Sequence, residues 1–258
     1  MKILESKKVL VVVLLPAYNE ASGIGRLLGR IATVLDHNDS DYHIVVVDDG
    51  STDQTQSIVS QCAKERSITL LSHPINQGLG KAMKTGISHI CSNFSGDDIL
   101  VTMDADNTHD PRMIKLMMRA ISRGADIVIG SRFLPESRET GVPLFRKFLT
   151  LLARILFLIM FPSLRVKDYT SGYRAYRLSL LRRAWKESHP LIRSKGFAVM
   201  PELLIRLSEF KSTIVEVPLV LRYDRKTSGS KIRIIPTLVE YGKVVSSLKL
   251  ERILALAR

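Results

Sequence analysis

The segment VTMDADNTHDP, Val101–Pro111, places two aspartates directly after a run of apolar residues. Asp104 and Asp106 are two positions apart, so on an extended chain their side chains point to the same side. Two carboxylates held this close repel each other unless one takes up a proton or a cation lies between them. Mg²⁺ or Mn²⁺, with water and substrate phosphates as further ligands, suits such a pair. Asp104 and Asp106 are therefore candidate metal ligands.

A D-x-D pattern alone is weak, because a solvated loop that begins a helix also contains it by chance. Three further polar clusters strengthen the metal interpretation, namely PAYNE at 16–20, DDGSTD at 48–53 and GSR at 130–132. Each of them follows an apolar run, as DAD does. In open parallel sheets, ligands bind outside the carboxyl ends of the strands. The four clusters therefore predict a single site at one edge of a sheet.

The elements that must position these clusters alternate along the chain. Apolar, β-branched runs predict buried strands at 9–15, 43–47, 68–71, 99–103 and 127–129. Residues with helical spacing lie between these runs, at 24–35, 58–62, 80–91 and 112–121. Such alternation predicts an α/β fold with a mostly parallel sheet and helices on both faces. We expect residues 1–258 to form a single domain.

The charge balance points to an anionic partner. Lys and Arg number 38 against 25 Asp and Glu, which gives a formal net charge of +13. Nucleic acid, a phosphorylated small molecule or an anionic membrane would each fit this charge. Aromatic residues make up 6% and are not interleaved with basic ones, so we expect no nucleic-acid partner. With only Cys62 and Cys91, the sequence predicts neither a disulfide framework nor a zinc site.

A series of motifs resembles a known family. In chain order they are PAYNE, VVVDDGSTD, NQGLGKAMKTGI, MDADNTHDP, GSRF, DYTSGYRAYR and VPLVLRYDRKTSGSK, over about residues 8–245. They resemble the family 2 glycosyltransferases, inverting enzymes of the GT-A fold. Within that family they are most similar to the dolichol-phosphate mannose synthases and related polyprenyl-phosphate glycosyltransferases.

The resemblance implies a division of labour and an activity. Residues 8–135 would bind the nucleotide sugar, and residues 136–245 would bind the acceptor. The implied reaction is inverting transfer of a sugar, with mannose from GDP-mannose favoured, to dolichyl or polyprenyl phosphate. Two alternatives stay open. One is a glucosyl or aminosugar transferase that uses a UDP-sugar, and the other is a non-catalytic protein that binds a sugar nucleotide.

The resemblance also assigns roles to residues. Asp106 and Arg132 would be catalytic, Asp104 and Asp106 would hold Mg²⁺ or Mn²⁺, and Ser171 and Arg174 would bind the acceptor phosphate. The nucleotide sugar would contact Pro16, Tyr18, Glu20, Val47, Asp49, Asp104, Ala105, Asp106, Arg132, Arg225 and Lys231. The sequence departs from the family pattern at Thr108, where Gln or Ser is common, and at Ser228, which replaces a glycine. Because a threonine hydroxyl is a weak metal ligand, the sequence does not assign a third protein ligand.

A lipid acceptor requires contact with a membrane. The run Phe148–Phe161 is apolar apart from Thr150 and Arg154, and basic residues flank it at both ends. It is too short to span a bilayer, which needs about 20 apolar residues. We expect a helix at 145–164 that lies in the membrane interface, in an enzyme peripheral to the cytoplasmic face. A buried core helix is the alternative.

Overall fold

The structure is a computed structural model that describes residues 9–37, 40–188, 190–227, 229 and 234–256. Its strands are β1 (Val11–Ala17), β2 (Tyr42–Asp48), β3 (Ile68–Ser72), β4 (Ile99–Thr102), β5 (Ile127–Ser131), β6 (Arg138–Thr140), β7 (Arg174–Arg177), β8 (Ile214–Pro218) and β9 (Val220–Arg222). Its α-helices are α1 (Ile24–Asp36), α2 (Thr55–Cys62), α3 (Leu79–Asn93), α4 (Met113–Ser122), α5 (Leu144–Met160), α6 (Leu178–Glu187), α7 (Val199–Ser208) and α8 (Ile234–Leu256). Two short 3₁₀ helices are η1 (Pro162–Leu164) and η2 (Tyr223–Arg225).

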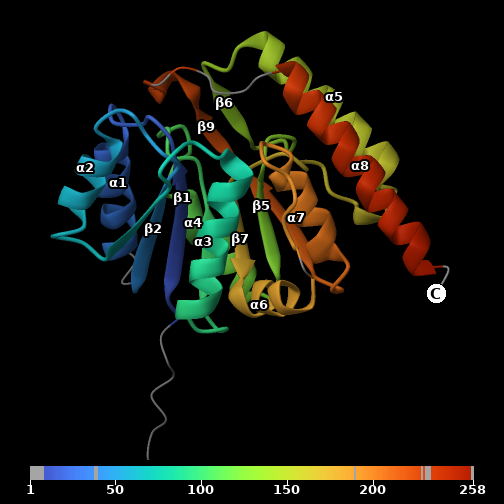
Figure 1. Cartoon of the computed structure of the whole chain (residues 1–258), viewed down its shortest axis with the longest axis horizontal. Coiled ribbons are helices and arrows are strands. Elements are labelled where there is room, and N and C mark those ends of the chain that lie inside the picture. The colour runs from blue at the N-terminus through green and yellow to red at the C-terminus, as the bar shows by residue number, and fades with distance from the viewer. Residues whose placement is uncertain (1–8, 38–39, 189, 228, 230–233, 257–258) are drawn as a thin grey trace, which may run out of the picture.

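Seven of the described strands form one sheet, in the order β3-β2-β1-β4-β7-β5-β8 (Figure 1). All neighbours pair in parallel except β7, which runs antiparallel between β4 and β5. The predicted α/β fold with a mostly parallel sheet is therefore confirmed. A second, two-stranded pair joins β6 to β9 in parallel and lies beyond the carboxyl ends of the main strands.

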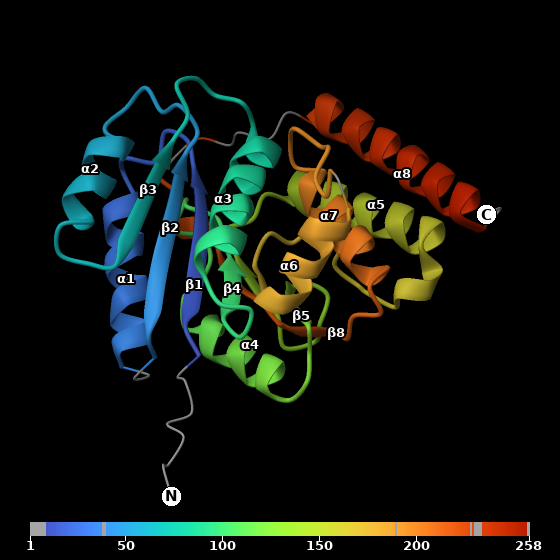
Figure 2. The same cartoon turned by 60° about the horizontal axis from the view of Figure 1, so that its bottom comes forward.

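Helices cover both faces of the sheet, which explains why the strands read as unbroken apolar runs. Along β1, Val12 and Leu14 pack into a core shared with α3, α5, α6, α7 and α8. Val11 and Val13 point the other way, into a core shared with α1, α2 and α4. Figure 2 shows the strands of the sheet with these helices around them. All four side chains have no exposed surface. Burial on both faces is typical of a parallel strand in the middle of an α/β sheet.

Helices α5 and α8 lie next to each other at the edge of the molecule (Figure 1). The rings of Phe157 in α5 and Tyr241 in α8 meet edge to face, with centroids 5.5 Å apart. Lys249 and Arg252 of α8 lie over the ring of Phe161, which follows α5. The helix expected at 145–164 thus corresponds to α5 followed by η1. Among the described residues, no helix is both long enough and apolar enough to cross a membrane.

Candidate functional site

The carboxyl ends of β1, β2 and β4 open into a cavity of about 970 Å³. We call it the donor cavity, after the nucleotide-sugar donor that the sequence resemblance leads us to expect there. Side chains from the segment 193–197 and from α8 also line it. The residues expected at the nucleotide site that line it are Pro16, Tyr18, Glu20, Asp49, Asp104, Ala105 and Asp106. The structure therefore brings three of the polar clusters, PAYNE, DDGSTD and DAD, to one place. The parallel order of β2, β1 and β4 is the reason, since it sets their carboxyl ends side by side.

Local hydrogen bonds fix the loop that carries the two aspartates. Asn107 takes a left-handed backbone conformation with φ of 64°, which asparagine tolerates better than most residues. The backbone N–H and the hydroxyl of Thr108 both donate to Oδ1 of Asp106, at 3.2 and 2.7 Å. The N–H of Asp104 donates to Nδ1 of His109 at 3.1 Å. These contacts hold both carboxylates at the mouth of β4.

The imidazole of His109 supports this loop from below. Its ring is buried and stacks on the ring of Tyr173, with centroids 4.7 Å apart. Because Nδ1 accepts the N–H of Asp104, the ring proton of the neutral form lies on Nε2, which is 3.8 Å from Oδ2 of Asp104. His109 therefore positions Asp104 and is held away from open solvent.

The pKa values of the two aspartates in this loop shift in opposite directions. Burial alone would raise the pKa of Asp106, but the ammonium of Lys226, which forms an ion pair with its carboxylate, and a hydrogen bond from Thr108 lower it below the ordinary value. The Asp104 carboxyl faces the cavity. About half of its side chain is exposed to the open cavity; the protein wall around it raises its pKa, and the nearby charge of Asp106 adds to that effect. Asp106 is therefore the carboxylate that stays ionised more readily.

The oxygen ligands that this loop offers fit a divalent cation that also binds a substrate. In the part of the chain that the structure describes, no cluster of three or more Asp, Glu, His or Cys could hold a metal by itself. Asp104 and Asp106 supply hard oxygen ligands, and both line the donor cavity. Mg²⁺ and Mn²⁺ are commonly held by one or two carboxylates, with phosphate oxygens and water completing the shell.

Asp49 accepts hydrogen bonds that hold the wall of the donor cavity in place. Its carboxylate accepts hydrogen bonds from Nδ1 of His73 at 2.7 Å and from the backbone N–H groups of Gln77 and Gly78, at 3.0 and 2.8 Å. Three of the four or so lone-pair positions of the carboxylate are thus used within the protein. Asp49 fixes the segment before α3, and one position remains for a ligand.

A second, smaller cavity of about 340 Å³ opens between α5, α8 and the loop after β4. We call it the acceptor cavity, because Ser171, which is expected to bind the acceptor phosphate, lines it. Among its lining residues are Arg132 and Ser171, together with apolar residues of both helices. It shares with the donor cavity the residues Leu79, Asp104, Asp106, Arg146, Phe197 and Thr237. The two cavities therefore meet at the aspartate pair.

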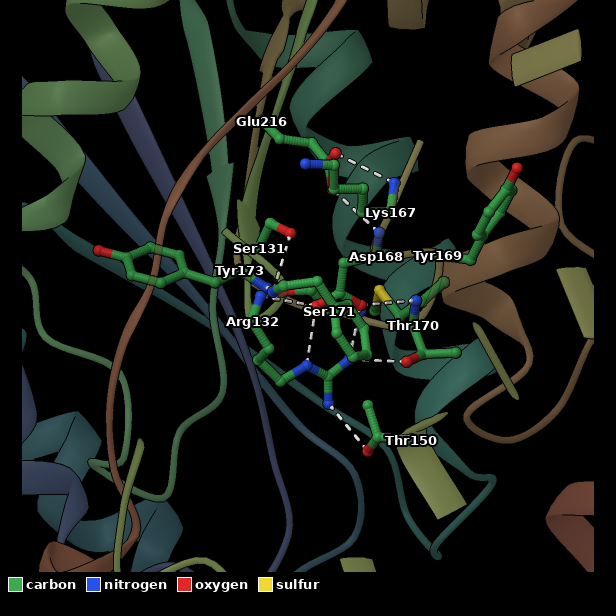
Figure 3. A network of polar contacts seen from close by, with 12 residues as sticks. Ser131, Arg132, Thr150, Lys167, Asp168, Tyr169, Thr170, Ser171, Tyr173 and Glu216 are labelled. Carbon is green, nitrogen blue, oxygen red and sulfur yellow. Dashed lines mark hydrogen bonds and ion pairs between the residues drawn. The ribbon is translucent and has the colours of Figure 1, made fainter. Parts of the chain in front are cut away.

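Arg132 directly follows β5 and lines the acceptor cavity. Figure 3 shows the polar contacts around it. Its guanidinium donates to both oxygens of Asp168, at 2.8 and 2.6 Å, and to the hydroxyl of Thr170 at 2.7 Å. Burial by itself would raise the pKa of Asp168, but the charge and hydrogen bonds of Arg132 hold it below the ordinary value. Much of the positive charge of Arg132 is thus balanced inside the protein.

Three residues of the expected site line neither cavity, and a fourth cannot be placed. Val47 is fully buried in β2 and lines neither cavity. Arg174 is also fully buried, and its guanidinium donates to the backbone carbonyls of Met200 and Tyr169, both at 2.6 Å, so it lines neither cavity. Arg225 lies in η2, outside both linings. Lys231 is outside the residues that the structure describes.

None of the cations that line the donor cavity was predicted, and two of them bear on the aspartate pair or on both cavities. Lys226 lines the donor cavity and pairs with Asp106, and Arg146 lines both cavities. Lys226 lies next to Arg225, but the family pattern drew attention to the latter. The sequence pattern presents Arg146 only as one of the basic residues that flank the apolar run Phe148–Phe161. A helical projection of residues 144–160 could have placed Arg146 on the same face as Thr150, Ala153 and Phe157, the inward face of α5.

Comparison with known proteins gives the family. The profile of Glycosyl transferase family 2 matches residues 12–188. The undecaprenyl-phosphate mannosyltransferase of Micrococcus luteus is 33% identical over 223 residues, which cover 86% of this chain and 87% of the relative. The polyprenol monophosphomannose synthase of Mycolicibacterium smegmatis is 31% identical, over 86% of this chain and 82% of the relative. The dolichol-phosphate mannosyltransferase of Pyrococcus furiosus is 31% identical over 85% of this chain, which spans only 60% of that protein.

Solved structures agree on the fold. Glucosyl-3-phosphoglycerate synthase from Mycobacterium tuberculosis, in complex with Mn²⁺, uridine diphosphate and phosphoglyceric acid, superposes with a TM-score of 0.66. The two proteins are 24% identical, over 95% of this chain and 78% of the synthase. The same synthase with Mg²⁺ and uridine diphosphate gives a TM-score of 0.64. The chain therefore belongs to glycosyl transferase family 2, and it is a glycosyltransferase of the GT-A fold.

Proposed function

We propose that this enzyme transfers a sugar from a nucleotide-sugar donor to a polyprenyl phosphate, with mannose from GDP-mannose as the favoured donor. The observation that carries the proposal is that the donor and acceptor cavities meet at Asp104 and Asp106. The similarity to polyprenyl-phosphate mannosyltransferases over most of the chain supports the choice of acceptor and sugar.

In the donor cavity, Tyr18 and Asp49 lie at the mouths of β1 and β2, where we place the nucleoside. The diphosphate then lies beside Asp104 and Asp106, which would hold Mg²⁺ or Mn²⁺ with it. The cation supplies Lewis-acid stabilisation of the charge that develops on the departing nucleoside diphosphate. Lys226 adds a positive charge at the same wall of the cavity.

The acceptor needs little activation from the protein. A phosphate monoester has a second pKa of about 6, so it is largely dianionic at neutral pH and needs no strong general base. Its oxygen attacks the anomeric carbon from the side opposite the leaving group. A new carbon–oxygen bond forms as the bond to the nucleoside diphosphate breaks, and the electron pair leaves on that diphosphate. The configuration at the anomeric carbon inverts.

Two anions must approach each other in this reaction, so a cation between them lowers their repulsion. Arg146 lies where the two cavities meet, and Arg132 and Ser171 line the acceptor cavity. We therefore assign the acceptor phosphate to the polar end of this cavity. This differs from the expectation for Arg174, whose guanidinium is committed to two backbone carbonyls beneath the site.

The lipid part of the acceptor would follow the apolar side of α5 and α8. Exposed apolar side chains on α5 are Leu144, Phe145, Phe148, Leu151, Leu152, Ile155 and Ile159. Those on α8 are Ile235, Leu238, Val239, Leu250 and Ile253. A surface of this size, on a protein with a net charge of +13, suits the interface of an anionic membrane. We place the enzyme at the cytoplasmic face, as a peripheral protein.

Only part of the run Phe148–Phe161 faces outward. Phe157 and Phe161 are buried, at 0% and 1% exposure, and Phe157 stacks on Tyr169 with centroids 5.4 Å apart. The helix is therefore amphipathic: one face packs on the core and the other is open. Both alternatives considered from the sequence thus describe part of the same helix.

A UDP-sugar is the second candidate for the donor. The structural neighbours with Mn²⁺ or Mg²⁺ contain uridine diphosphate or UDP-glucose. The same cavity and the same aspartate pair would serve a uridine nucleotide, since the diphosphate is common to both donors.

A direct assay tests the proposal. The purified enzyme is given radiolabelled GDP-mannose, UDP-glucose or UDP-N-acetylglucosamine, each with a short polyprenyl phosphate, in Mg²⁺, in Mn²⁺ or in EDTA. We expect butanol-extractable label from GDP-mannose with either cation and none in EDTA. Label from a UDP-sugar alone would establish the second candidate. Absence of label with every donor would contradict the proposed function.

A further inference from the structure

The ion pair between Lys226 and Asp106 joins residues that are 120 positions apart in the sequence. The ammonium of Lys226 meets Oδ2 of Asp106, and the two side chains are only 11% and 13% exposed. Oδ1 of the same carboxylate accepts the two hydrogen bonds from Thr108. Lys226 is therefore the cationic partner that the structure gives to one of the two carboxylates proposed as metal ligands.

The segment that carries Lys226 is fastened over the aspartate loop. The N–H of Arg222 donates to the carbonyl of Thr108 at 2.8 Å, and an isolated antiparallel bridge pairs Leu221 with His109. Beyond Lys226, the hydroxyls of Thr227 and Ser22 lie 2.7 Å apart. These contacts hold the lysine from both sides. Its position is therefore part of the fold and differs from that of an ordinary surface cation.

A positive charge at this position has a physical reason. Asp104 and Asp106 both point into the donor cavity, and two carboxylates at this spacing repel each other unless a cation or a proton offsets them. A divalent cation supplies that charge when it binds. The ammonium of Lys226 supplies it here, at the oxygen that a metal would need.

We propose that Lys226 holds the place of the divalent cation on Asp106 and is displaced from it when the cation binds. This inference rests on the proposed metal role of Asp106. An ammonium and a metal ion cannot both lie in contact range of the same Oδ2, because their charges repel at that distance. Lys226 therefore competes with the metal and weakens its binding to the nucleotide-free enzyme.

The displaced ammonium then needs another anion. It lines the donor cavity, where the proposed function places the donor diphosphate. Lys226 thus exchanges a carboxylate for a phosphate as cation and donor bind. The exchange couples occupation of the metal site to the position of the Lys226 side chain, and it favours cation binding when the diphosphate is present to pair with the ammonium.

Metal binding without nucleotide tests the competition directly. Mn²⁺ is titrated into the wild type, Lys226→Met and Lys243→Met, and free Mn²⁺ is followed by its electron paramagnetic resonance signal. Lys243 lines the same cavity and is exposed, so its replacement removes one charge without touching the Asp106 pair. We expect Lys226→Met to bind Mn²⁺ about tenfold more tightly than the wild type, equivalent to about 1.4 kcal/mol. The control should change affinity by less than about twofold.

Equal affinities of the wild type and Lys226→Met would overturn the inference, as would equal gains in both variants, since a gain of that kind is only a general charge effect. Asp106→Asn separates this failure from a failure of the proposed metal site. If Asp106→Asn binds Mn²⁺ as well as the wild type does, the carboxylate is no ligand and the proposed metal role fails. If Asp106→Asn loses Mn²⁺ while Lys226→Met is unchanged, only the competition is wrong.

A second measurement follows the Lys226 ammonium in the wild-type enzyme, with two variants as references. Lysine side chains are ¹³C-dimethylated, and the Lys226 signal is assigned as the one absent in Lys226→Arg. We expect saturating Mg²⁺ to move this signal to the position that it has in Asp106→Asn without Mg²⁺, because both conditions remove the ion pair. A Lys226 signal that stays in place at saturating Mg²⁺ would contradict displacement.

Discussion

The guanidinium of Arg132 meets the carboxylate of Asp168 in a two-point ion pair, with Nε–Oδ2 at 2.8 Å and Nη2–Oδ1 at 2.6 Å (Figure 3). The same carboxylate accepts the backbone N–H groups of Thr170 and Ser171, at 3.2 and 3.0 Å. Asp168 therefore fixes both the arginine at the end of β5 and the segment that lines the acceptor cavity.

Asp168→Asn should destabilise the protein strongly. The change leaves the buried charge of Arg132 without its counter-charge, and breaking a buried pair costs about 3 to 5 kcal/mol. The measurement is the free energy of unfolding in urea at pH 7. Asp224→Asn is the matched control, because the Asp224–Arg222 pair is about one-third exposed on both sides, and solvent screening should leave its loss with little effect on stability. Equal losses in the two variants would argue against a special role for Asp168.

Acid should remove the contribution of Asp168. Arg132 lowers its folded-state pKa, so its carboxylate contributes stability that is complete above the unfolded value of about 3.9. That contribution disappears as the pH falls through the lower, folded value. The difference in unfolding free energy between the wild type and Asp168→Asn should thus be constant from pH 7 to about 5 and shrink below about pH 4. A difference that persists unchanged in acid would contradict this assignment.

Replacement of two glycines by alanine should change the stability of the protein in opposite directions. A Cβ on Gly80, in the first turn of α3, would lie 1.9 Å from the backbone oxygen of Ser194, so Gly80→Ala must push the cavity wall away from α3. A Cβ on Gly29, inside α1, meets nothing within 4 Å, and Gly29→Ala should stabilise the helix by up to about 1 kcal/mol. Thermal unfolding of both variants is the measurement. A stable Gly80→Ala with unchanged donor affinity would show that this close contact is not required.

Asp106→Asn should abolish most of the proposed transferase activity while the fold survives. The substitution removes the carboxylate charge but keeps the shape, so a loss in kcat of about 100-fold or more is expected from lost transition-state stabilisation. Sugar transfer is measured with Mg²⁺ or Mn²⁺ and short polyprenyl phosphate, and circular dichroism checks the fold. Asp97→Asn, at an exposed position before β4, is the control and should keep full activity. Retention of activity in Asp106→Asn would count against its metal role.

Serine at Phe148 and Ile159 together should weaken membrane binding without unfolding the protein. These side chains are 59% and 64% exposed on the open face of α5. Sedimentation with vesicles rich in anionic lipid measures binding, and urea unfolding measures stability. Leu116→Ser, which alters an exposed leucine on α4, is the control for binding and should leave vesicle binding unchanged. Phe157→Ser is the control for stability and should lower the free energy of unfolding by about 3 kcal/mol, because it replaces a buried ring. Unchanged vesicle binding by the double variant would sink the interface proposal.

The sequence by itself determined where strands end and which side chains follow them. Unbroken apolar runs identify strands buried on both faces, and the turn residues after them mark the ligand edge, since this information is local. Asp104 and Asp106 could be placed at the end of β4 for that reason, and the structure puts them in the donor cavity. The expected α/β fold and family follow from the same local motifs.

Only the tertiary structure decided which distant groups meet. The motif around Arg174 implied a contact with the acceptor phosphate, yet this segment forms β7, which is inserted antiparallel between β4 and β5, and the guanidinium is buried. The contact of Lys226 with Asp106 depends on how the segment after β9 crosses the aspartate loop. The inward and outward faces of α5 likewise depend on its packing against α8. These features arise from long-range pairing and packing, which no local pattern of residues encodes.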